Sequence, residues 1–406
     1  MVGPAFLQNV SATPSADIPT ITSAEGGEGN SCGLVGTGRS LSVVGLLQLP
    51  IDPGMPHQPE EATSKAKSDI NNSSSHLRVR IIRVAMDNLP QLGKAIAQVV
   101  VPTYQLYKPL LLIQADTIKS TSRQTFSYGK HPRQQLDLYT PTSTTQSKIS
   151  NSALIFLYGG GFVRGDKINP GFPEGLVYAN VGHFFAENLG VKVVIPDYRL
   201  ISHGAAFPSG GQDLELVIDW VNGHMGNDMA KPMNLYIMGN SAGGVHLATY
   251  LFAPEFGRSR QRMLIGDAPD LKLKGVIFLS APFHFDCAVA ERAQNLQAYF
   301  GNHVGNLCPL GLLRSCKEDG SISEFKRVPV MVLYGGLDPE DEILRSKNEF
   351  VKEWIETDVV ADELTVLKME GHNHISPVLG LGTGISKEEA WGRQVVEFII
   401  AAASKG

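Results

Sequence analysis

The sequence of 406 residues contains few cysteines and lacks a leader-like N-terminus. Its four cysteines, Cys32, Cys287, Cys308 and Cys316, form no CxxC pair and no spacing typical of a metal site. This usage favours reduced thiols, with a Cys308–Cys316 disulfide as the alternative in an oxidising compartment. The first residues include no basic segment followed by a continuous apolar one, as a standard signal peptide requires. We therefore expect a cytoplasmic protein.

The sequence also contains no segment typical of a membrane span and no cluster of basic residues. The longest apolar segment, Ala95 to Tyr107, is interrupted by Gln98, Pro102 and Gln105, and it is shorter than the ~20 residues that a bilayer crossing needs. The formal net charge is −5 and the charged residues are dispersed, which disfavours nucleic acid as a partner. We expect a small, neutral ligand and no transmembrane segment. The pattern leaves the oligomeric state open.

Composition divides the chain into three parts. Residues 1–75 are rich in Ser, Thr, Gly, Pro and Asn, which predicts a disordered N-terminal extension. Residues 76–115 have apolar residues at helical spacing interrupted by three prolines, which predicts two or three helix pieces. These pieces either cover the active site as a cap or pack as an ordinary N-terminal helix. Residues 116–406 are predicted to form the main domain, which the motifs below indicate to be catalytic.

Within the main domain, apolar strand patterns alternate with amphipathic helices. A hairpin is predicted between residues 126 and 140, and strand–helix–strand units follow it, which implies right-handed parallel crossovers. The sequence thus predicts a doubly wound, mostly parallel α/β sheet, with the ligand site at the carboxyl ends of its strands. The predicted buried strands are residues 153–157, 191–196, 234–240, 275–280, 328–334 and 364–369.

The segment from Asn234 to Phe252 passes from a short apolar strand through a serine into a helix. In Gly239-Asn240-Ser241-Ala242-Gly243 the serine lies on a strand-to-helix turn so tight that the positions two residues away need small side chains. This turn presents the Ser241 hydroxyl as a nucleophile. It also leaves the Ala242 N–H free at the positive end of a helix, where a developing oxyanion is stabilised. The same pattern at residues 29–33 has no strand before it and no helix after it.

A glycine run follows the predicted strand 153–157. In Tyr158-Gly159-Gly160-Gly161-Phe162 the backbone can turn several N–H groups toward one point. We predict that the N–H groups of Gly160 and Gly161 contribute to an oxyanion hole. A phosphate-binding loop is the alternative, but the GxxxxGK[ST] and GxGxxG spacings are missing.

Several motifs occur together in one order. They are Tyr-Gly-Gly-Gly-Phe at 158–162, Asp-Tyr-Arg-Leu at 197–200, Phe207-Pro208 with Asp213, and Gly-Asn-Ser-Ala-Gly-Gly at 239–244. In this order they resemble the α/β-hydrolase superfamily, within its carboxylesterase and hormone-sensitive-lipase-like branch, over about residues 126–402. The resemblance implies an α/β-hydrolase sheet with helical cap insertions. The branch usually has His-Gly-Gly-Gly where this chain has Tyr158. The backbone donors do not depend on that side chain, but its effect on the loop stays open.

The resemblance also implies an acid after the serine, in a loop that follows a late strand. Asp338, in Gly-Gly-Leu-Asp-Pro, is the implied acid and would orient the catalytic histidine. The segment departs by one residue from the usual Asp-Pro-x-x-Asp-Glu of the family. Asp341 and Glu340 are close alternatives, and Asp286 is a more distant one.

The catalytic base is expected in Gly-His-Asn-His-Ile-Ser, residues 371–376, which offers two histidines. Physical reasoning alone does not separate them. Related sequences favour His374, with His372 as the alternative base or as a residue lining the pocket. A metal site at this HxH is disfavoured because no further ligand stands at a suitable spacing. His246 is interpreted as a packed helix residue, and Arg199 and Asp213 as structural.

Two segments are candidates for shaping the pocket, residues 166–179 and the long insertion 284–327. Each is either a lid or ordinary packed surface structure.

These observations lead to one main functional hypothesis. We expect a serine hydrolase that cleaves a carboxylic ester through an acyl-enzyme, with no cofactor and no metal. A close alternative is hydrolysis of an aryl formamide, a lactone or a thioester in a secondary-metabolite pathway. An alternative of another class is a non-catalytic receptor that uses the same fold and pocket only for binding.

Overall fold

The computed structural model describes residues 87–225, 231–264, 270–357 and 364–405. The chain divides into two units, Met1–Ala62 and Thr63–Gly406, and all described residues belong to the second. The predicted N-terminal extension, residues 1–75, therefore lies outside the described residues. So does the second Gly-x-Ser-x-Gly pattern at residues 29–33.

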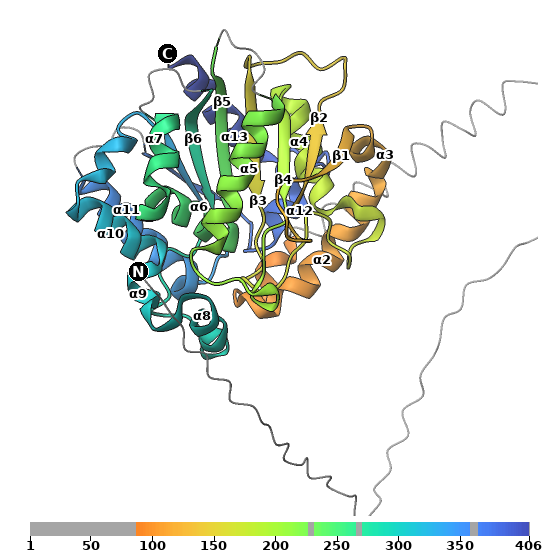
Figure 1. The fold of residues 1–406 in the computed structure, drawn as a ribbon. Coiled ribbons are helices and arrows are strands. Elements are labelled where there is room, and N and C mark those ends of the chain that lie inside the picture. Colours follow the sequence, from red (N-terminus) through yellow and green to blue (C-terminus); the bar gives the residue numbers. More distant parts are fainter. Residues whose placement is uncertain (1–86, 226–230, 265–269, 358–363, 406) are drawn as a thin grey trace, which may run out of the picture. The chain divides into compact units, whose positions relative to one another are not determined.

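An eight-stranded sheet forms the centre of the described part of the chain, in the order β1-β2-β4-β3-β5-β6-β7-β8 (Figure 1). The hairpin β1–β2 is antiparallel, β2 pairs antiparallel with β4, and the remaining neighbours are parallel. This confirms the predicted doubly wound α/β architecture. The strands are β1 Ser122–Ser127, β2 Gln135–Thr140, β3 Ser152–Leu157, β4 Lys192–Pro196, β5 Met233–Asn240, β6 Leu271–Leu279, β7 Val330–Gly335 and β8 Leu364–Met369.

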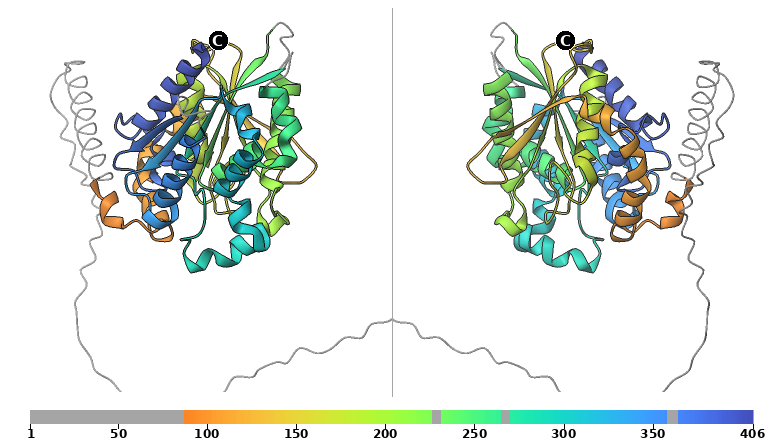
Figure 2. Two further views of the ribbon diagram at one scale, coloured as in Figure 1. Left: turned by 90° about the vertical axis from the view of Figure 1, so that its left-hand side faces the viewer. Right: turned by 90° about the vertical axis from the view of Figure 1, so that its right-hand side faces the viewer.

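Helices cover both faces of the sheet, as Figures 1 and 2 show. Strand β3 illustrates the consequence, because Leu154 and Phe156 enter one hydrophobic core whereas Ala153, Ile155 and Leu157 enter the other. Strands buried on both faces have continuous apolar sequences rather than alternating ones. This is why the central strands are recognisable in the sequence.

The helices divide between the two faces according to the core they contact. Helices α2 Ile96–Ile113, α3 Ala115–Lys119, α4 Leu176–Leu189, α12 Ser376–Gly380 and α13 Ala390–Ser404 contribute to the first core. The second core includes residues of α5 Ser209–Met225, α6 Ala242–Phe252, α7 Gly257–Leu264, α10 Pro309–Glu318 and α11 Arg345–Ile355.

The N-terminal helical segment differs from its prediction. Pro90 lies in a separate 3₁₀ turn, Leu89–Leu92, as expected, but α2 continues through both Pro102 and Pro109. Each proline removes one helical N–H donor. Burial of one face of α2 against the body compensates for this loss, because most helical stability in proteins comes from tertiary packing. The buried residues of α2 are Val99, Thr103, Tyr107, Leu110 and Leu111.

The predicted insertion 284–327 folds into three helices, α8 Ala293–Phe300, α9 Val304–Leu307 and α10. Helix α10 packs in the second core, as an ordinary surface helix does. Residues of α8 instead join a small third cluster with Phe162, Ala242 and Val245, beside the predicted nucleophile. Among the described residues, no helix is long and apolar enough to cross a membrane.

Candidate active site

Ser241 lies at the turn between β5 and α6, with φ 50° and ψ −119°. A positive φ is uncommon for a residue other than glycine and occurs often at functional sites. The flanking glycines are needed for close approach, as predicted. A Cβ at Gly239 would lie 2.6 Å from the Gly243 oxygen, and a Cβ at Gly243 would lie 2.2 Å from the Leu157 oxygen. The turn therefore closes only with glycine at both positions.

Ser241, His374 and Asp338 form one chain of hydrogen bonds. The Ser241 Oγ lies 3.0 Å from His374 Nε2, and His374 Nδ1 lies 2.9 Å from Asp338 Oδ1. The three residues follow the carboxyl ends of β5, β8 and β7, the edge at which the ligand site was predicted. With Nδ1–H donating to the carboxylate, Nε2 is left to accept the serine proton.

The Asp338 carboxylate is fully buried and is held by two further donors. Its Oδ2 accepts a hydrogen bond of 2.7 Å from the Ser280 hydroxyl and one of 2.6 Å from the Gly335 N–H. Hydrogen bonds to both carboxylate oxygens stabilise the charged form in a buried position. Sequence reasoning missed Ser280, whose only signal is its place directly after an apolar strand.

The alternative acids lie away from this chain of hydrogen bonds. The side chain of Asp341 is 65% exposed and pairs with Arg345, and Glu340 is also exposed. Asp286 is 75% exposed and lies near His284. Of the four candidate acids, Asp338 is the one whose carboxylate contacts a histidine of residues 371–376.

The second histidine, His372, is buried in a different environment. Its Nδ1 lies 2.9 Å from the Ser376 hydroxyl, and its Nε2 has no hydrogen-bond partner within the described part of the chain. Burial lowers the pKa of His372 to about 4, so the ring is neutral at physiological pH. His372 is thus a packed neighbour of the histidine that contacts Ser241.

Helix α2 is linked to the histidine loop by side-chain hydrogen bonds. The Asn373 Nδ2–H donates to Thr103 Oγ1 over 2.8 Å, and the Tyr107 hydroxyl donates to Glu388 Oε2 over 2.6 Å. Burial raises the pKa of Glu388 to about 7, although the hydrogen bond from Tyr107 acts in the opposite direction. The segment before the main domain therefore contacts the loop that carries His374.

The glycine run lies directly beside the nucleophile. A Cβ at Gly159 would be 2.9 Å from the Ser241 Cβ. Gly160 and Gly161 have φ values of 154° and 61°, and a Cβ at Gly160 would collide with the Arg164 oxygen at 1.8 Å. Among the described residues, the N–H groups of Gly160, Gly161 and Ala242 have no hydrogen-bond partner. Such N–H groups are available to bind an oxyanion.

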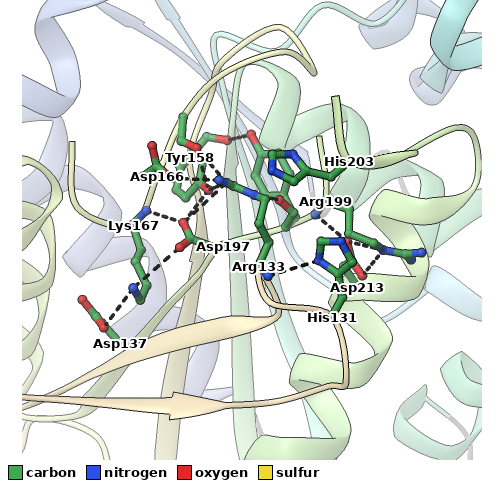
Figure 3. Close-up of polar contacts among 12 residues, drawn as sticks. His131, Arg133, Asp137, Tyr158, Asp166, Lys167, Asp197, Arg199, His203 and Asp213 are labelled. Atoms are coloured by element: carbon green, nitrogen blue, oxygen red, sulfur yellow. Dashed lines mark hydrogen bonds and ion pairs between the residues drawn. The ribbon is translucent and has the colours of Figure 1, made fainter. Parts of the chain in front are cut away.

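Tyr158, which stands where this branch usually has histidine, belongs to a polar network with Arg133 and Asp197 (Figure 3). Its hydroxyl donates to Asp197 Oδ1 over 2.7 Å and accepts from Arg133 Nη2 over 3.0 Å. Arg133 also donates to the Gly165 carbonyl over 2.7 Å, and this hydrogen bond anchors the C-terminal end of the loop that begins at Gly159. Burial raises the pKa of Asp197, while the Tyr158 hydrogen bond and nearby cations partly offset the shift.

Aromatic stacking also holds Tyr158 in place. Its ring stacks on Tyr178 and Tyr198, with centroid distances of 5.3 and 4.8 Å, and the Tyr198 hydroxyl donates to the Tyr158 carbonyl over 2.8 Å. Both ends of residue 158, backbone and side chain, are therefore fixed directly before the glycines. A tyrosine at this position is compatible with an ordered loop.

Arg199, Asp213 and His246, which the sequence predicts to be structural, contact other protein groups. Arg199 Nε donates to Asp213 Oδ1 over 2.9 Å, and the Arg199 N–H donates to Asp213 Oδ2 over 2.8 Å. His246 is buried between aromatic rings, and burial lowers its pKa to about 3. Cys308 and Cys316 are free thiols.

Ser241 lines a small pocket that is partly open to solvent. Ile96 at the start of α2 lines this pocket, as does the beginning of the insertion 284–327, whereas residues 166–179 contribute none of its described lining. Besides Ser241, the lining comprises apolar Ile96, Pro282, Phe285, Ala288 and Ile343 together with polar His284, Arg292 and Glu342.

Comparisons with known proteins agree with this architecture. The model of the BD-FAE family, an esterase family of α/β-hydrolases, matches residues 136–266. Human bile salt-activated lipase is 23% identical over 314 residues, which cover 71% of this chain and 39% of the lipase. The chain thus spans well under half the length of this relative.

Two solved esterases share the fold. Esterase B from Lactobacillus rhamnosis has a TM-score of 0.52 and 16% identity, with 74% of this chain and 96% of that chain covered. Carboxyl esterase 2 from Tuber melanosporum has a TM-score of 0.52 and 15% identity, with 73% and 99% covered. The chain thus has the fold of these esterases and is similar in sequence, over the matched segments, to an α/β-hydrolase esterase family and to a lipase.

Proposed function

We propose that the protein hydrolyses carboxylic esters through a Ser241–His374–Asp338 triad. The observation that carries the proposal is the continuous chain of hydrogen bonds from Asp338 through His374 to Ser241, with distances of 2.9 and 3.0 Å. Similarity to a lipase and to solved esterases supports an ester as the scissile bond. The substrate is a small molecule that reaches Ser241 through the pocket that this residue lines.

In the proposed reaction, His374 Nε2 takes the proton of Ser241 as the serine oxygen attacks the ester carbonyl carbon. The tetrahedral oxyanion accepts hydrogen bonds from the N–H groups of Gly160, Gly161 and Ala242, each typically contributing about a hundredfold or more to the rate. The protonated His374 then gives its proton to the leaving alcohol, and an acyl-enzyme remains on Ser241. Water, deprotonated by the same histidine, releases the acid and regenerates the serine.

Asp338 acts on the histidine and not on the substrate. Its carboxylate accepts from His374 Nδ1–H, which fixes the tautomer with a free Nε2 and stabilises the imidazolium. Ser280 and the Gly335 N–H occupy the second carboxylate oxygen, so the first points at the imidazole in one orientation. Preorganisation of this kind lowers the cost of reaching the transition state.

Reaction with a fluorophosphonate probe tests the proposal. We expect covalent labelling of the wild-type protein and none of Ser241→Ala, together with release of p-nitrophenol from p-nitrophenyl butyrate by the wild type alone. A folded wild-type protein that neither reacts with the probe nor cleaves short esters would instead support the non-catalytic receptor. Faster turnover of an aryl formamide, a lactone or a thioester than of esters would support that alternative.

A further inference from the structure

The pocket wall contains an ion pair among mostly apolar residues. Arg292, in the 3₁₀ turn Ala290–Arg292, donates from Nε to Glu342 Oε1, and both residues line the pocket together with Ser241. Glu342 is 9% exposed and belongs to the π-helix Glu340–Leu344, directly after the Asp338 loop. The Glu342 carboxylate is thus largely removed from water, whereas the Arg292 side chain is 32% exposed. A charge that is largely removed from water is costly unless its polar atoms find partners.

Those remaining polar atoms are unused within the described part of the chain. Arg292 makes its one side-chain hydrogen bond there through Nε, which leaves Nη1 and Nη2 as donors. Glu342 accepts there through Oε1, which leaves Oε2 as an acceptor. The pair thus offers donors and an acceptor side by side in the pocket wall.

The guanidinium also lies next to the proposed oxyanion hole. A Cβ at Gly161 would be 3.7 Å from Arg292 Nη1, so the guanidinium lies close to the loop that carries the Gly160 and Gly161 N–H groups. A ligand atom bound by Arg292 is therefore within a few bonds of a carbonyl bound at those N–H groups.

We propose that Arg292 and Glu342 together bind a hydroxyl group of the substrate, close to the scissile carbonyl. The inference rests on the proposed ester hydrolysis and adds the substrate class. A hydroxyl accepts one hydrogen bond and donates another, so it satisfies both partners at once. A carboxylate is attracted by Arg292 but repelled by Glu342. An ammonium group is attracted by Glu342 but repelled by Arg292. A plain alkyl group displaces water and leaves the buried polar atoms without partners, which costs affinity.

The hydroxyl can belong to the acyl group or to the alcohol, and two matched pairs of esters separate these sources. The acyl side is tested with p-nitrophenyl 3-hydroxybutyrate against p-nitrophenyl butyrate. The alcohol side is tested with 2,3-dihydroxypropyl butyrate against propyl butyrate. The readout is the ratio of kcat/KM for the hydroxylated ester to that for the plain one. p-Nitrophenyl hemisuccinate serves as the carboxylate probe.

In the wild type we expect a ratio of about ten or more for one of the two pairs, which is the range of a hydrogen bond to a charged group. Arg292→Met removes the donors, and the ratio falls to within about twofold of one. Glu342→Gln keeps an acceptor for Arg292 but removes the negative charge, so hemisuccinate turnover rises several-fold relative to butyrate. If Arg292→Met is poorly folded, Arg292→Lys provides the second measurement, because a lysine lacks the fork of donors and lowers the ratio.

Arg314→Met is the matched control. Arg314 also donates from Nε to a glutamate, Glu353, over 3.0 Å, but its side chain is 53% exposed on α10 and lines no part of the pocket. The ratio in this variant stays at the wild-type value. Three results would overturn the inference: no preference in the wild type for either pair, an undiminished preference in Arg292→Met, or a wild-type preference for hemisuccinate over 3-hydroxybutyrate.

Fluorophosphonate labelling of the same preparations distinguishes failure of the hydroxyl site from failure of the proposed ester hydrolysis. If Ser241 reacts and plain butyrate is cleaved while the ratios do not depend on Arg292, the hydroxyl site is refuted and ester hydrolysis stands. If the folded wild type neither reacts nor cleaves any ester, the proposed function itself is refuted.

Discussion

Removing the Tyr158 hydroxyl tests whether its polar contacts hold the glycine run, residues 159–161, in position for the proposed oxyanion hole. Tyr158→Phe deletes the hydrogen bonds to Asp197 and Arg133, of 2.7 and 3.0 Å, and keeps the ring that stacks on Tyr178 and Tyr198. The substitution therefore changes polar contacts with little change in packing.

The expected loss of stability depends on the hydrogen bonds that Arg133 and Asp197 keep in the variant. Hydrogen bonds to charged groups contribute about 1.5 to 3 kcal/mol each. Arg133 keeps Asp166, Gly165 and the Tyr198 carbonyl, and Asp197 keeps the Lys167 N–H, so neither charge is left alone. We expect the free energy of unfolding to fall by about 2 kcal/mol, less than the summed range of about 3 to 6 kcal/mol, because both charged partners keep other hydrogen bonds.

The catalytic effect is expected in kcat. The loop begins at Gly159, next to Ser241, and small displacements of donors reduce transition-state stabilisation more than ground-state binding. We expect kcat for p-nitrophenyl butyrate to fall about tenfold while KM stays within about twofold. Urea unfolding and steady-state kinetics measure the two effects.

Tyr236→Phe is the matched control. Tyr236 is fully buried on β5, the strand that leads to Ser241, and its hydroxyl has no hydrogen-bond partner among the described residues. Its loss leaves kcat near the wild-type value. A folded Tyr158→Phe with unchanged kcat would refute the argument that this hydroxyl positions the loop.

Three further predictions concern the histidine loop. His374→Ala is expected to lower kcat by about 10⁴-fold or more, whereas His372→Gln is expected to retain about a tenth or more of the wild-type activity. Wild-type kinetics in His374→Ala would exclude His374 as the catalytic base. Asp338→Asn lowers kcat by about 10³-fold or more because the amide favours the wrong tautomer of His374; full activity in this folded variant would show that another acid serves. Because burial raises the folded-state pKa of Glu388 from 4.5 to about 7, the folded state holds this proton more tightly than the unfolded state. Its stabilisation is complete below about pH 4.5 and is lost as pH rises through 7, by about 3 kcal/mol. The loss should appear as the difference between the pH profiles of the wild type and Glu388→Gln in denaturant unfolding between pH 4.5 and 8, because His372 and His246 contribute equally to both profiles. Identical profiles would contradict it.

The sequence was sufficient wherever the determining interactions are local. The Gly239–Gly243 turn is recognisable because strand, serine and helix follow one another within a few positions, and Gly239 is required by contacts inside this segment. The need for Gly243 comes from the Leu157 carbonyl of β3, which the local sequence does not show. The buried strands were also recognisable, since a sheet covered on both faces requires continuous apolar runs. Helix α2 was the exception, because its continuity through Pro102 and Pro109 depends on packing against a body that local propensity does not include.

The tertiary structure alone decided which side chains meet. His372 and His374 are two positions apart in similar sequence surroundings, and only the packing of their loop directs one ring at Ser241 and the other at Ser376. Arg292 and Glu342 are fifty positions apart, and no periodicity relates them. Local chain geometry fixes a turn or a strand, whereas contacts between distant segments arise only when the core has set the relative positions of their backbones. The turn that carries Ser241 was therefore recognisable in the sequence, whereas the side chains that line the pocket beside it were not.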